Sequence, residues 1–178
     1  IKPGQHKVLD FGASWGYGTW QFAQWGFDAI GLEISQSRTR FGRQKLGVDL
    51  RTSAEEIAEP VDVFFSSHVI EHFSQPSLAI EQARKLLKPD GLFNAYTTNG
   101  CDEFRRVNPD SYHRAWGGVH PSYLDDRYWR RMFPDAWHFF ASIPVDLDCA
   151  RNWNQESNCC LNLDSSELVF VAKLKPGQ

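Results

Sequence analysis

The sequence has no long uninterrupted apolar run, and none of its hydrophobic stretches approaches the ~20 residues that a membrane-spanning helix needs. Its first ten residues, IKPGQHKVLD, lack the apolar core of a secretory signal peptide. The sequence therefore predicts a protein without a membrane span, and we expect a cytoplasmic location. Because the first residue is Ile1 and not methionine, we also expect further chain to precede it.

An excess of one charge is also missing. The 178 residues include 19 Lys and Arg against 22 Asp and Glu, for a net charge of −3. Proteins that bind nucleic acids usually carry a concentrated basic face, so this balance argues against a nucleic-acid partner. A chain of this length is expected to fold as one domain around a hydrophobic core, which we place over residues 1–178. The oligomeric state is not predicted by any feature of the sequence.

Cysteine is scarce, with four residues and no C-x-x-C pair. Reduced thiols are therefore expected, and the adjacent Cys159 and Cys160 have poor geometry for a shared zinc ion. Aromatic residues, in contrast, are plentiful: Phe, Trp and Tyr make up 14 % of the chain, within an ordinary hydrophobic content of 42 %. The chain thus has the material for a sizeable core.

Apolar bursts alternate with amphipathic stretches, a pattern typical of a parallel sheet covered by helices. We predict strands over residues 7–11, 28–34, 48–51, 62–66, 92–98, 137–145 and 167–174. Helices are predicted over residues 17–25, 35–45 and 77–87 and after a cap at Ser122, with Phe22, Ala23 and Trp25 facing inward on the first helix. Residues 88–91 are interpreted as a turn, and residues 99–120 as an irregular loop over the site.

The stretch VLDFGASWGYGTW, residues 8–20, places glycines directly after the first predicted strand. The dinucleotide-binding fingerprint G-x-G-x-x-G does not match. If it starts at Gly12, its second and third glycines are replaced by Ser14 and Tyr17. If it starts at Gly16, its third glycine is replaced by Gln21. A Walker phosphate loop fails too, because no Gly-Lys-Ser/Thr follows. The pattern that fits is D-x-G-x-S-x-G from Asp10 to Gly16, followed by an acid, Glu33, at the end of the second strand.

These two motifs resemble those of the class I S-adenosylmethionine-dependent methyltransferases, which usually have Gly in place of Ser14. The segment VDVFFSSHVIEHFSQP, residues 61–76, is similar to the fourth motif of the branch that includes the quinone-biosynthesis methyltransferases, and LLKPDGLFNAYTTN, residues 86–99, to its helix-turn-strand. The resemblance implies an α/β, Rossmann-like, doubly wound sheet of seven mostly parallel strands in the order 3-2-1-4-5-7-6, with an antiparallel last strand. It also implies a lid segment upstream of residue 1.

The resemblance further implies a site for S-adenosyl-L-methionine, which leaves as S-adenosyl-L-homocysteine. Such a ligand brings no phosphate and needs bare backbone, which Gly12 and Gly16 allow. Asp10 would hold the ammonium group and Glu33 the ribose hydroxyls, although both acids could instead only cap loops. The full set of predicted cofactor-binding residues is Asp10, Gly12, Ala13, Ser14, Gly16, Glu33, Ile34, Ser53, Ala54, Ser67 and His68.

His68, Glu71 and His72 form H-x-x-E-H, a spacing that would place all three on one helical face. The inverted zinc-peptidase motif has this form, but here it follows a predicted buried strand, where the methyltransferase pattern already accounts for Glu71 and His72. Some methyltransferases that resemble this segment carry E-x-x-E-H there and hold a divalent metal. Our main interpretation contains no metal ligand. A metal-assisted alternative would use His68, Glu71 and His72, with His120 as a further nitrogen, and would favour a transition ion over magnesium.

The predicted activity is transfer of a methyl group to a small-molecule acceptor by in-line displacement, which mainly requires the two reactants to be held in line. A general base is needed only for a hydroxyl or a protonated amine, and His68, His113 and His120 are the candidates, with His68 and His120 preferred. Aromatic side chains could line the acceptor pocket or belong to the core: Tyr112, Trp116, Tyr123, Tyr128 and Trp129. The alternative class is a non-catalytic domain that binds the cofactor or a partner.

Overall fold

The computed structural model describes residues 1–115, 117 and 120–176. Its centre is an eight-stranded sheet with the order β3-β2-β1-β4-β5-β8-β6-β7. The strands are β1 Lys7–Phe11, β2 Asp28–Leu32, β3 Asp49–Arg51, β4 Val61–Ser67, β5 Leu87–Thr98, β6 Ala136–Ser142, β7 Cys159–Cys160 and β8 Glu167–Leu174. Strands β3, β2, β1, β4 and β5 are parallel to one another, and β8 is antiparallel to both β5 and β6. The predicted order is confirmed.

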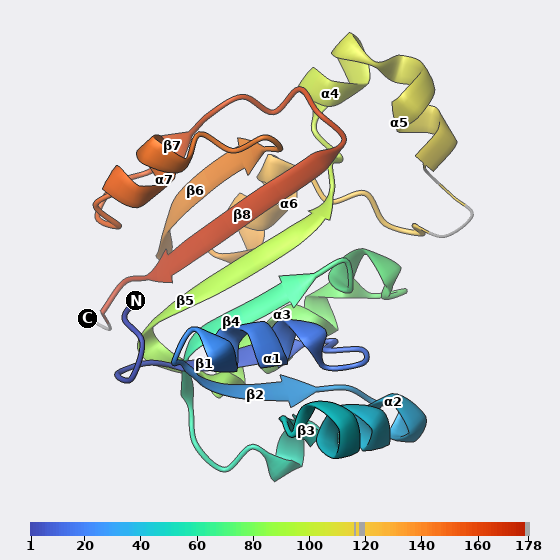
Figure 1. The fold of residues 1–178 in the computed structure, drawn as a ribbon. Coiled ribbons are helices and arrows are strands. Elements are labelled where there is room, and N and C mark those ends of the chain that lie inside the picture. The colour runs from blue at the N-terminus through green and yellow to red at the C-terminus, as the bar shows by residue number, and fades with distance from the viewer. Residues whose placement is uncertain (116, 118–119, 177–178) are drawn as a thin grey trace.

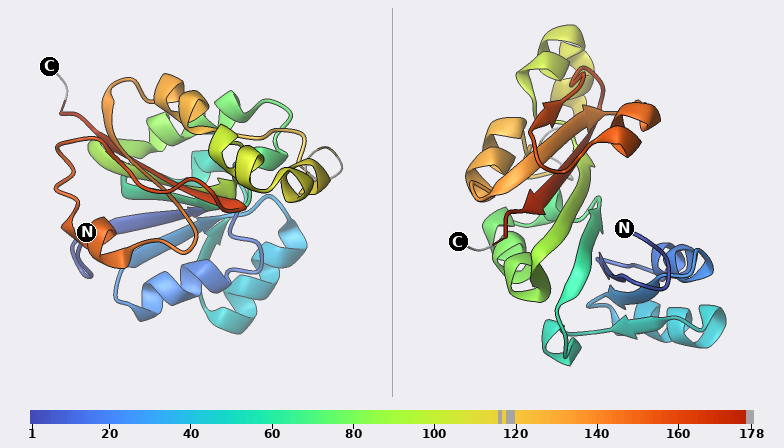
Figure 2. Two further views of the ribbon diagram at one scale, coloured as in Figure 1. Left: turned by 90° about the horizontal axis from the view of Figure 1, so that it is seen from above. Right: turned by 90° about the vertical axis from the view of Figure 1, so that its left-hand side faces the viewer.

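Helices cover both faces of the sheet. They are α1 Tyr17–Gln24, α2 Gln36–Phe41, α3 Pro76–Leu86, α4 Asp102–Val107, α5 Pro109–Ala115, α6 Asp126–Met132 and α7 Leu147–Asn152, with short helical turns η1 Gly42–Leu46, η2 Ala54–Glu56 and η3 Ile70–His72. Helices α1 and α2 lie on one face, and α3 and α6 on the other, whereas α4 and α5 project beyond the carboxyl ends of the central strands (Figures 1 and 2). This is the doubly wound arrangement that alternating apolar and amphipathic segments predict.

One part of the hydrophobic core is a cluster of aromatic rings between β4, β5, β8 and α6. Trp129 of α6 is fully buried and stacks on Phe170 at a ring-centroid distance of 4.9 Å. Phe93 of β5 stacks on Phe64 of β4 at 5.4 Å and lies 4.6 Å from Phe133. Core packing therefore accounts for part of the high aromatic content, whereas Trp15, Tyr17, Trp20 and Trp25 are exposed. Trp129, one of the candidates for an acceptor pocket, belongs to this core, and Trp116 lies outside the described residues.

Two strand predictions need correction. The sheet has eight strands and not seven, because the two-residue β7 pairs in parallel with β6 at Phe139–Cys159 and Phe140–Cys160. The predicted turn at residues 88–91 lies inside β5: Val61 pairs with Leu87 and Val63 with Leu92, so the intervening residues form a bulge opposite Asp62. A segment as short as β7 carries no periodic signal, which is why the pattern did not reveal it.

Three helix predictions also need correction. The inward face of α1 is formed by Thr19, which is buried, and by Phe22, which is half-buried and lies 5.2 Å from Phe65 of β4, as predicted. Trp25, in contrast, is 64 % exposed, and Ala23 is also exposed. Residues 99–120 contain α4 and α5, and the start of α5 is marked by Asn108, whose side chain accepts the Ser111 N–H at 3.2 Å. The cap of α6 is Asp125 and not Ser122, since the Asp125 carboxylate accepts the Tyr128 N–H at 2.7 Å.

Among the residues that the structure describes, no helix has both the length and the apolar character to cross a membrane. All four cysteines are free thiols, with Cys101 buried.

Candidate functional site

The site residues predicted from the sequence gather where β2, β1, β4 and β5 end, because parallel neighbours bring their carboxyl ends to one edge of the sheet. Phe11 at the end of β1 pairs with Leu32 of β2 and with Ser66 of β4. The loop after β1, the acid after β2 and the segment after β4 therefore meet at this edge. The predicted residues thus come from separate parts of the chain that the fold makes neighbours.

The loop after β1 uses its own amide groups inside the protein. The Gly12 and Ala13 N–H groups donate to the Leu32 carbonyl at 2.8 and 3.0 Å, and the Gly16 N–H donates to the Ala13 carbonyl at 2.8 Å. The Ser14 N–H donates to Glu33 Oε2 at 2.9 Å. Phosphate-binding loops present such amides to an anion, so these four bonds leave this loop poorly suited to phosphate and better suited to a ligand without one.

Left-handed backbone conformations explain the residue types in this loop. Gly12 and Gly16 have φ values of 78° and 88°, and Ser14 has φ 51°. The position of Ser14 therefore favours glycine for its backbone conformation and not only for its small size. At Gly12, a Cβ atom would lie 2.3 Å from Val69 Cγ2, so this glycine lets the segment after β4 pack directly on the loop. Val69 had no signal in the sequence that marked it as part of the site.

Glu33, directly after β2, links the loop that follows β1 to the segment that follows β2. The residue is 7 % exposed, and its carboxylate accepts two backbone N–H groups, from Ser14 at 2.9 Å and from Ser35 at 2.8 Å. A carboxylate has about four acceptor positions, so both oxygens can still accept further hydrogen bonds. The next residue, Ile34, is 86 % exposed. A buried acid and an exposed apolar side chain therefore stand next to each other at this strand end.

Asp10 is buried at the end of β1 and faces α1. Its Oδ2 accepts the Thr19 hydroxyl at 2.8 Å, and a Cβ at Gly18 would lie 2.8 Å from the same oxygen. Burial raises the pKa of the Asp10 carboxyl, while the Thr19 hydrogen bond opposes the rise. Gly18 and Thr19 thus bring α1 close to this carboxylate, a contact that helical periodicity did not predict.

Ser53 and Ala54, expected beside the adenine, lie after β3. The Ser53 side chain accepts the Glu55 N–H at 3.3 Å in a capping box with Glu56, so its hydroxyl has a structural role in the η2 turn. Ala54 lines a groove of about 430 Å³ between η2 and α3, together with Phe73 and Leu78.

Ser67 is the last residue of β4 and is half-buried opposite Tyr96. His68 follows it in a left-handed conformation with φ 52°, and its N–H donates to the Tyr96 carbonyl at 2.8 Å. Its Nδ1 lies 3.2 Å from Glu71 Oε1 and its Nε2 lies 3.8 Å from Glu167 Oε2. The hydrogen bond with Glu71 raises the pKa of His68. A positive φ at a residue other than glycine often marks a functional position.

The prediction that His68, Glu71 and His72 share one helical face is wrong. Glu71 and His72 lie in the short η3 turn, His68 lies before it, and α3 begins only at Pro76. The cause is Glu71, which is 0 % exposed and accepts the Thr98 N–H at 3.3 Å. The buried Glu71 holds residues 68–72 against the end of β5, where they do not form a regular helix.

His120 lies next to His72, with ring centroids 5.0 Å apart. One ligating atom from each of Glu71, His72 and His120 can be chosen so that all three lie within 4.8 Å of one another. The structure therefore brings His120, predicted as a base, to the edge of the sheet where the H-x-x-E-H segment lies.

Comparisons with known proteins agree with this geometry. Residues 2–141 match the protein family described as "Methyltransferase domain". The ubiquinone biosynthesis O-methyltransferase of Cereibacter sphaeroides is 32 % identical over 122 residues, which cover 64 % of this chain and 47 % of the relative. The corresponding enzyme of Bartonella tribocorum is 30 % identical over 102 residues, which cover 52 % of this chain and 41 % of that relative. The chain therefore spans less than half the length of these two relatives.

A solved S-adenosylmethionine-dependent methyltransferase from Archaeoglobus fulgidus superposes with a TM-score of 0.64 at 16 % identity, covering 96 % of this chain and 86 % of the other. At that identity the likeness shows the fold alone. The family match covers most of the chain and agrees with the motifs at Asp10, Gly12 and Glu33. The chain therefore belongs to the methyltransferase-domain family, within the class I S-adenosylmethionine-dependent methyltransferases.

Proposed function

We propose that this protein transfers the methyl group of S-adenosylmethionine to an oxygen atom of a small-molecule acceptor. The observation that carries the proposal is the pair at the end of β2, where the buried Glu33 carboxylate adjoins the 86 % exposed Ile34. A carboxylate there can accept both ribose hydroxyl groups, and an exposed aliphatic side chain offers an apolar surface to a flat adenine ring. Burial of Ile34 under the base would remove its apolar area from water, which is favourable.

The remaining predicted residues would hold the rest of the cofactor. The loop from Gly12 to Gly16, with Ala13 and Ser14, would pass along the methionine part, and Asp10 would act on the ammonium group through water. Ser67 and His68 would border the sulfonium from β4. A ligand with no phosphate suits a loop whose amides are already used inside the protein. A solved mycolic acid cyclopropane synthase with a TM-score of 0.56 was crystallised with S-adenosylhomocysteine, which supports this choice of ligand for the fold.

Transfer to oxygen is favoured because the curated relatives from Cereibacter and Bartonella are named O-methyltransferases. In the reaction, an acceptor oxygen attacks the methyl carbon as the carbon–sulfur bond breaks. The sulfur leaves as neutral S-adenosylhomocysteine, and the acceptor proton passes to a base. His68, fixed at the end of β4, and His120 are the candidates for this base.

The experiment is a screen of acceptor classes with cofactor labelled at the methyl carbon. Catechols, phenols, carboxylic acids and amines are tested separately, and the product is hydrolysed to locate the label. We expect label in an ether or ester linkage. Label found only in amine products contradicts the choice of oxygen, and no transfer to any class while the cofactor still binds supports the non-catalytic alternative.

A further inference from the structure

A polar cavity lies between α2, η1 and the end of β3. Its volume is about 430 Å³, which is within the range of ~300–1,000 Å³ that small-molecule pockets occupy. The side chains that line it are all polar, and they are those of Gln36, Thr39, Arg40, Arg43, Gln44 and Thr52. None of the described residues that line it is acidic, although the protein as a whole has a net charge of −3.

The spacing of the lining residues along the helix is unusual for their type. Residues 36, 39, 40, 43 and 44 follow the spacing i, i+3, i+4, i+7, i+8 along α2 and η1, and all five line the same cavity. On a surface helix of a globular protein, a stripe with this spacing is normally apolar and packs on the core. Here the stripe is polar throughout and carries two guanidinium groups. Such a stripe is explained if it contacts a charged ligand.

The two arginines of the cavity are held in different ways. Arg43 donates through Nε to the Leu50 carbonyl of β3 at 2.8 Å, and its Nη2 lies 4.0 Å from Glu56 Oε2. Arg43 therefore has a structural role on β3, and Glu56 offsets part of its charge. Arg40 is exposed and has no hydrogen bond or ion pair among the described residues. Its guanidinium group is therefore available to a ligand.

We propose that this cavity binds a phosphate group carried by a small polar molecule, such as a sugar phosphate. A guanidinium group matches two phosphate oxygens with a pair of charged hydrogen bonds, and Arg40 supplies this contact. The amide groups of Gln36 and Gln44 can donate to and accept from the hydroxyl groups of the carrier. The volume of the cavity leaves room for such a carrier beside the phosphate group.

The cavity is distinct from the proposed cofactor site, although the two are close. The Thr39 hydroxyl donates to the Glu33 carbonyl oxygen at 3.0 Å, so the cavity begins near the first turn of α2. The Glu33 side chain, which the proposed function assigns to the ribose, does not line it. S-adenosylmethionine also has no phosphate group. A phosphate ligand should therefore bind together with the cofactor, and this inference does not depend on the proposed function.

The test is calorimetric titration with ribose 5-phosphate, with ribose as the uncharged reference. We expect one site per chain for ribose 5-phosphate and no binding of ribose. Arg40→Gln should weaken binding at least ~10-fold, since hydrogen bonds to a charged group are lost. Its unfolding in urea should be unchanged, because Arg40 is exposed and without a partner among the described residues.

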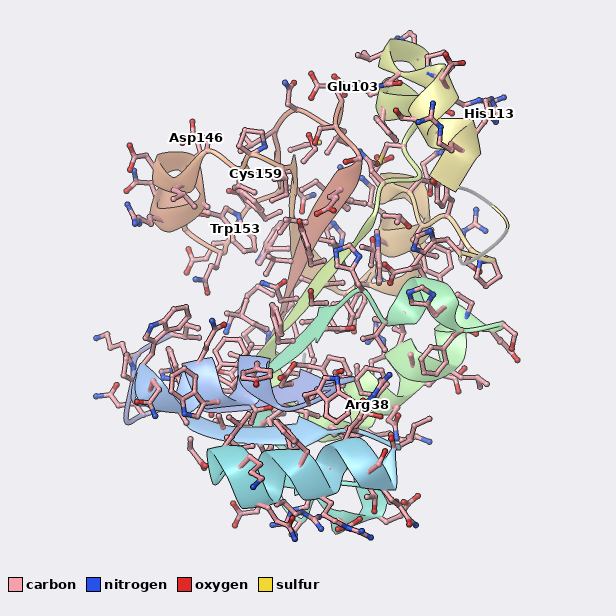
Figure 3. All side chains as sticks on the ribbon, turned by 45° about the vertical axis from the view of Figure 1, so that its right-hand side comes forward. Arg38, Glu103, His113, Asp146, Trp153 and Cys159 are labelled. Atoms are coloured by element: carbon pink, nitrogen blue, oxygen red, sulfur yellow. The ribbon has the colours of Figure 1, made fainter. Side chains whose placement is uncertain are left out.

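The matched control is Arg38→Gln, which removes the same charge from the same helix. The Arg38 guanidinium lies over the Trp15 ring, 5.8 Å from its centroid, and does not line the cavity (Figure 3). This variant should bind ribose 5-phosphate nearly as the unaltered protein does. An equal loss of affinity in Arg38→Gln and Arg40→Gln overturns the proposal, because it indicates general attraction to a basic helix and not a site.

Three further results contradict the proposal. Absence of ribose 5-phosphate binding refutes it outright. Sedimentation with vesicles that contain phosphatidylglycerol, but not with vesicles of phosphatidylcholine alone, and without binding of ribose 5-phosphate, assigns the phosphate to a lipid headgroup and overturns the small-molecule ligand. Competition between ribose 5-phosphate and S-adenosylmethionine contradicts a separate cavity. Protein that binds ribose 5-phosphate but not S-adenosylmethionine refutes only the proposed function, and the reverse result refutes only this inference.

Discussion

Truncation of Glu33 tests the link between the cofactor site and the structure of its loops. Glu33→Ala removes a carboxylate that accepts the Ser14 N–H at 2.9 Å and the Ser35 N–H at 2.8 Å. Hydrogen bonds to charged groups contribute about 1.5–3 kcal/mol each. Ser14 and Ser35 are half-buried, so water can replace part of the lost contact. We therefore expect the free energy of unfolding to fall by roughly 1–3 kcal/mol in total.

The same substitution should weaken binding of S-adenosylmethionine at least tenfold, since loss of a charged hydrogen-bonding pair with the ribose costs about 1.5–3 kcal/mol. Affinity is measured by calorimetry at a temperature where urea unfolding shows the variant to be folded. Glu33→Gln keeps the shape of the side chain and one acceptor oxygen. Its affinity for S-adenosylmethionine should therefore lie between those of Glu33→Ala and the unaltered protein. Glu156→Ala is the control, because Glu156 is an exposed acid in the connection between β6 and β8. An unchanged affinity in folded Glu33→Ala refutes the assignment of Glu33 to the ribose.

Three further substitutions test other parts of the structure. Gly12→Ala places a Cβ 2.3 Å from Val69 Cγ2 at φ 78°, so unfolding in urea should show a loss of about 1–3 kcal/mol; stability equal to that of the unaltered protein contradicts this packing. Burial lowers the pKa of His138, whose Nε2 lies 2.7 Å from the Phe133 carbonyl oxygen. At a pH below 6.5, the ordinary pKa of histidine, His138 therefore takes up a proton more readily in the unfolded chain than in the folded chain. The free energy of unfolding consequently decreases as the pH is lowered. When the pH is lowered from about 7 to 5.5, the free energy of unfolding of His138→Gln should decrease less than that of the unaltered protein. Equal decreases contradict a lowered pKa at His138. Ile34→Ser should weaken cofactor binding severalfold while unfolding changes by less than about 0.5 kcal/mol, because Ile34 is 86 % exposed; unchanged affinity removes Ile34 from the adenine site.

The central part of the fold was predictable because its signals are local. The apolar strands that carry Asp10 and that end before Glu33 were evident from the local pattern, whereas their order in the sheet was implied by the resemblance to the class I methyltransferases. Ser14 shows the limit of such reasoning. The sequence showed only a serine where the family usually has glycine, whereas the structure shows a left-handed conformation with φ 51°. Sequence patterns report volume and polarity more directly than backbone angles.

The incorrect predictions concern contacts between distant segments. The inward face of α1 depends on Thr19 and Gly18 fitting against Asp10, a close approach that a hydrophobic stripe does not reveal. Helical periodicity also misplaced Glu71, because this acid is buried at the end of β5 and not on a solvated helix face. The proximity of His72 and His120 depends on how residues 99–120 fold back over the sheet edge, which no local pattern determines.

The most direct test of the central claim is calorimetric titration of the folded protein with S-adenosylmethionine and, separately, with S-adenosylhomocysteine. The structure predicts that each ligand binds at one site per chain, and that each competes with the other for it. Folded protein that binds neither ligand contradicts the claim that the edge formed by Gly12, Glu33 and Ile34 is a cofactor site.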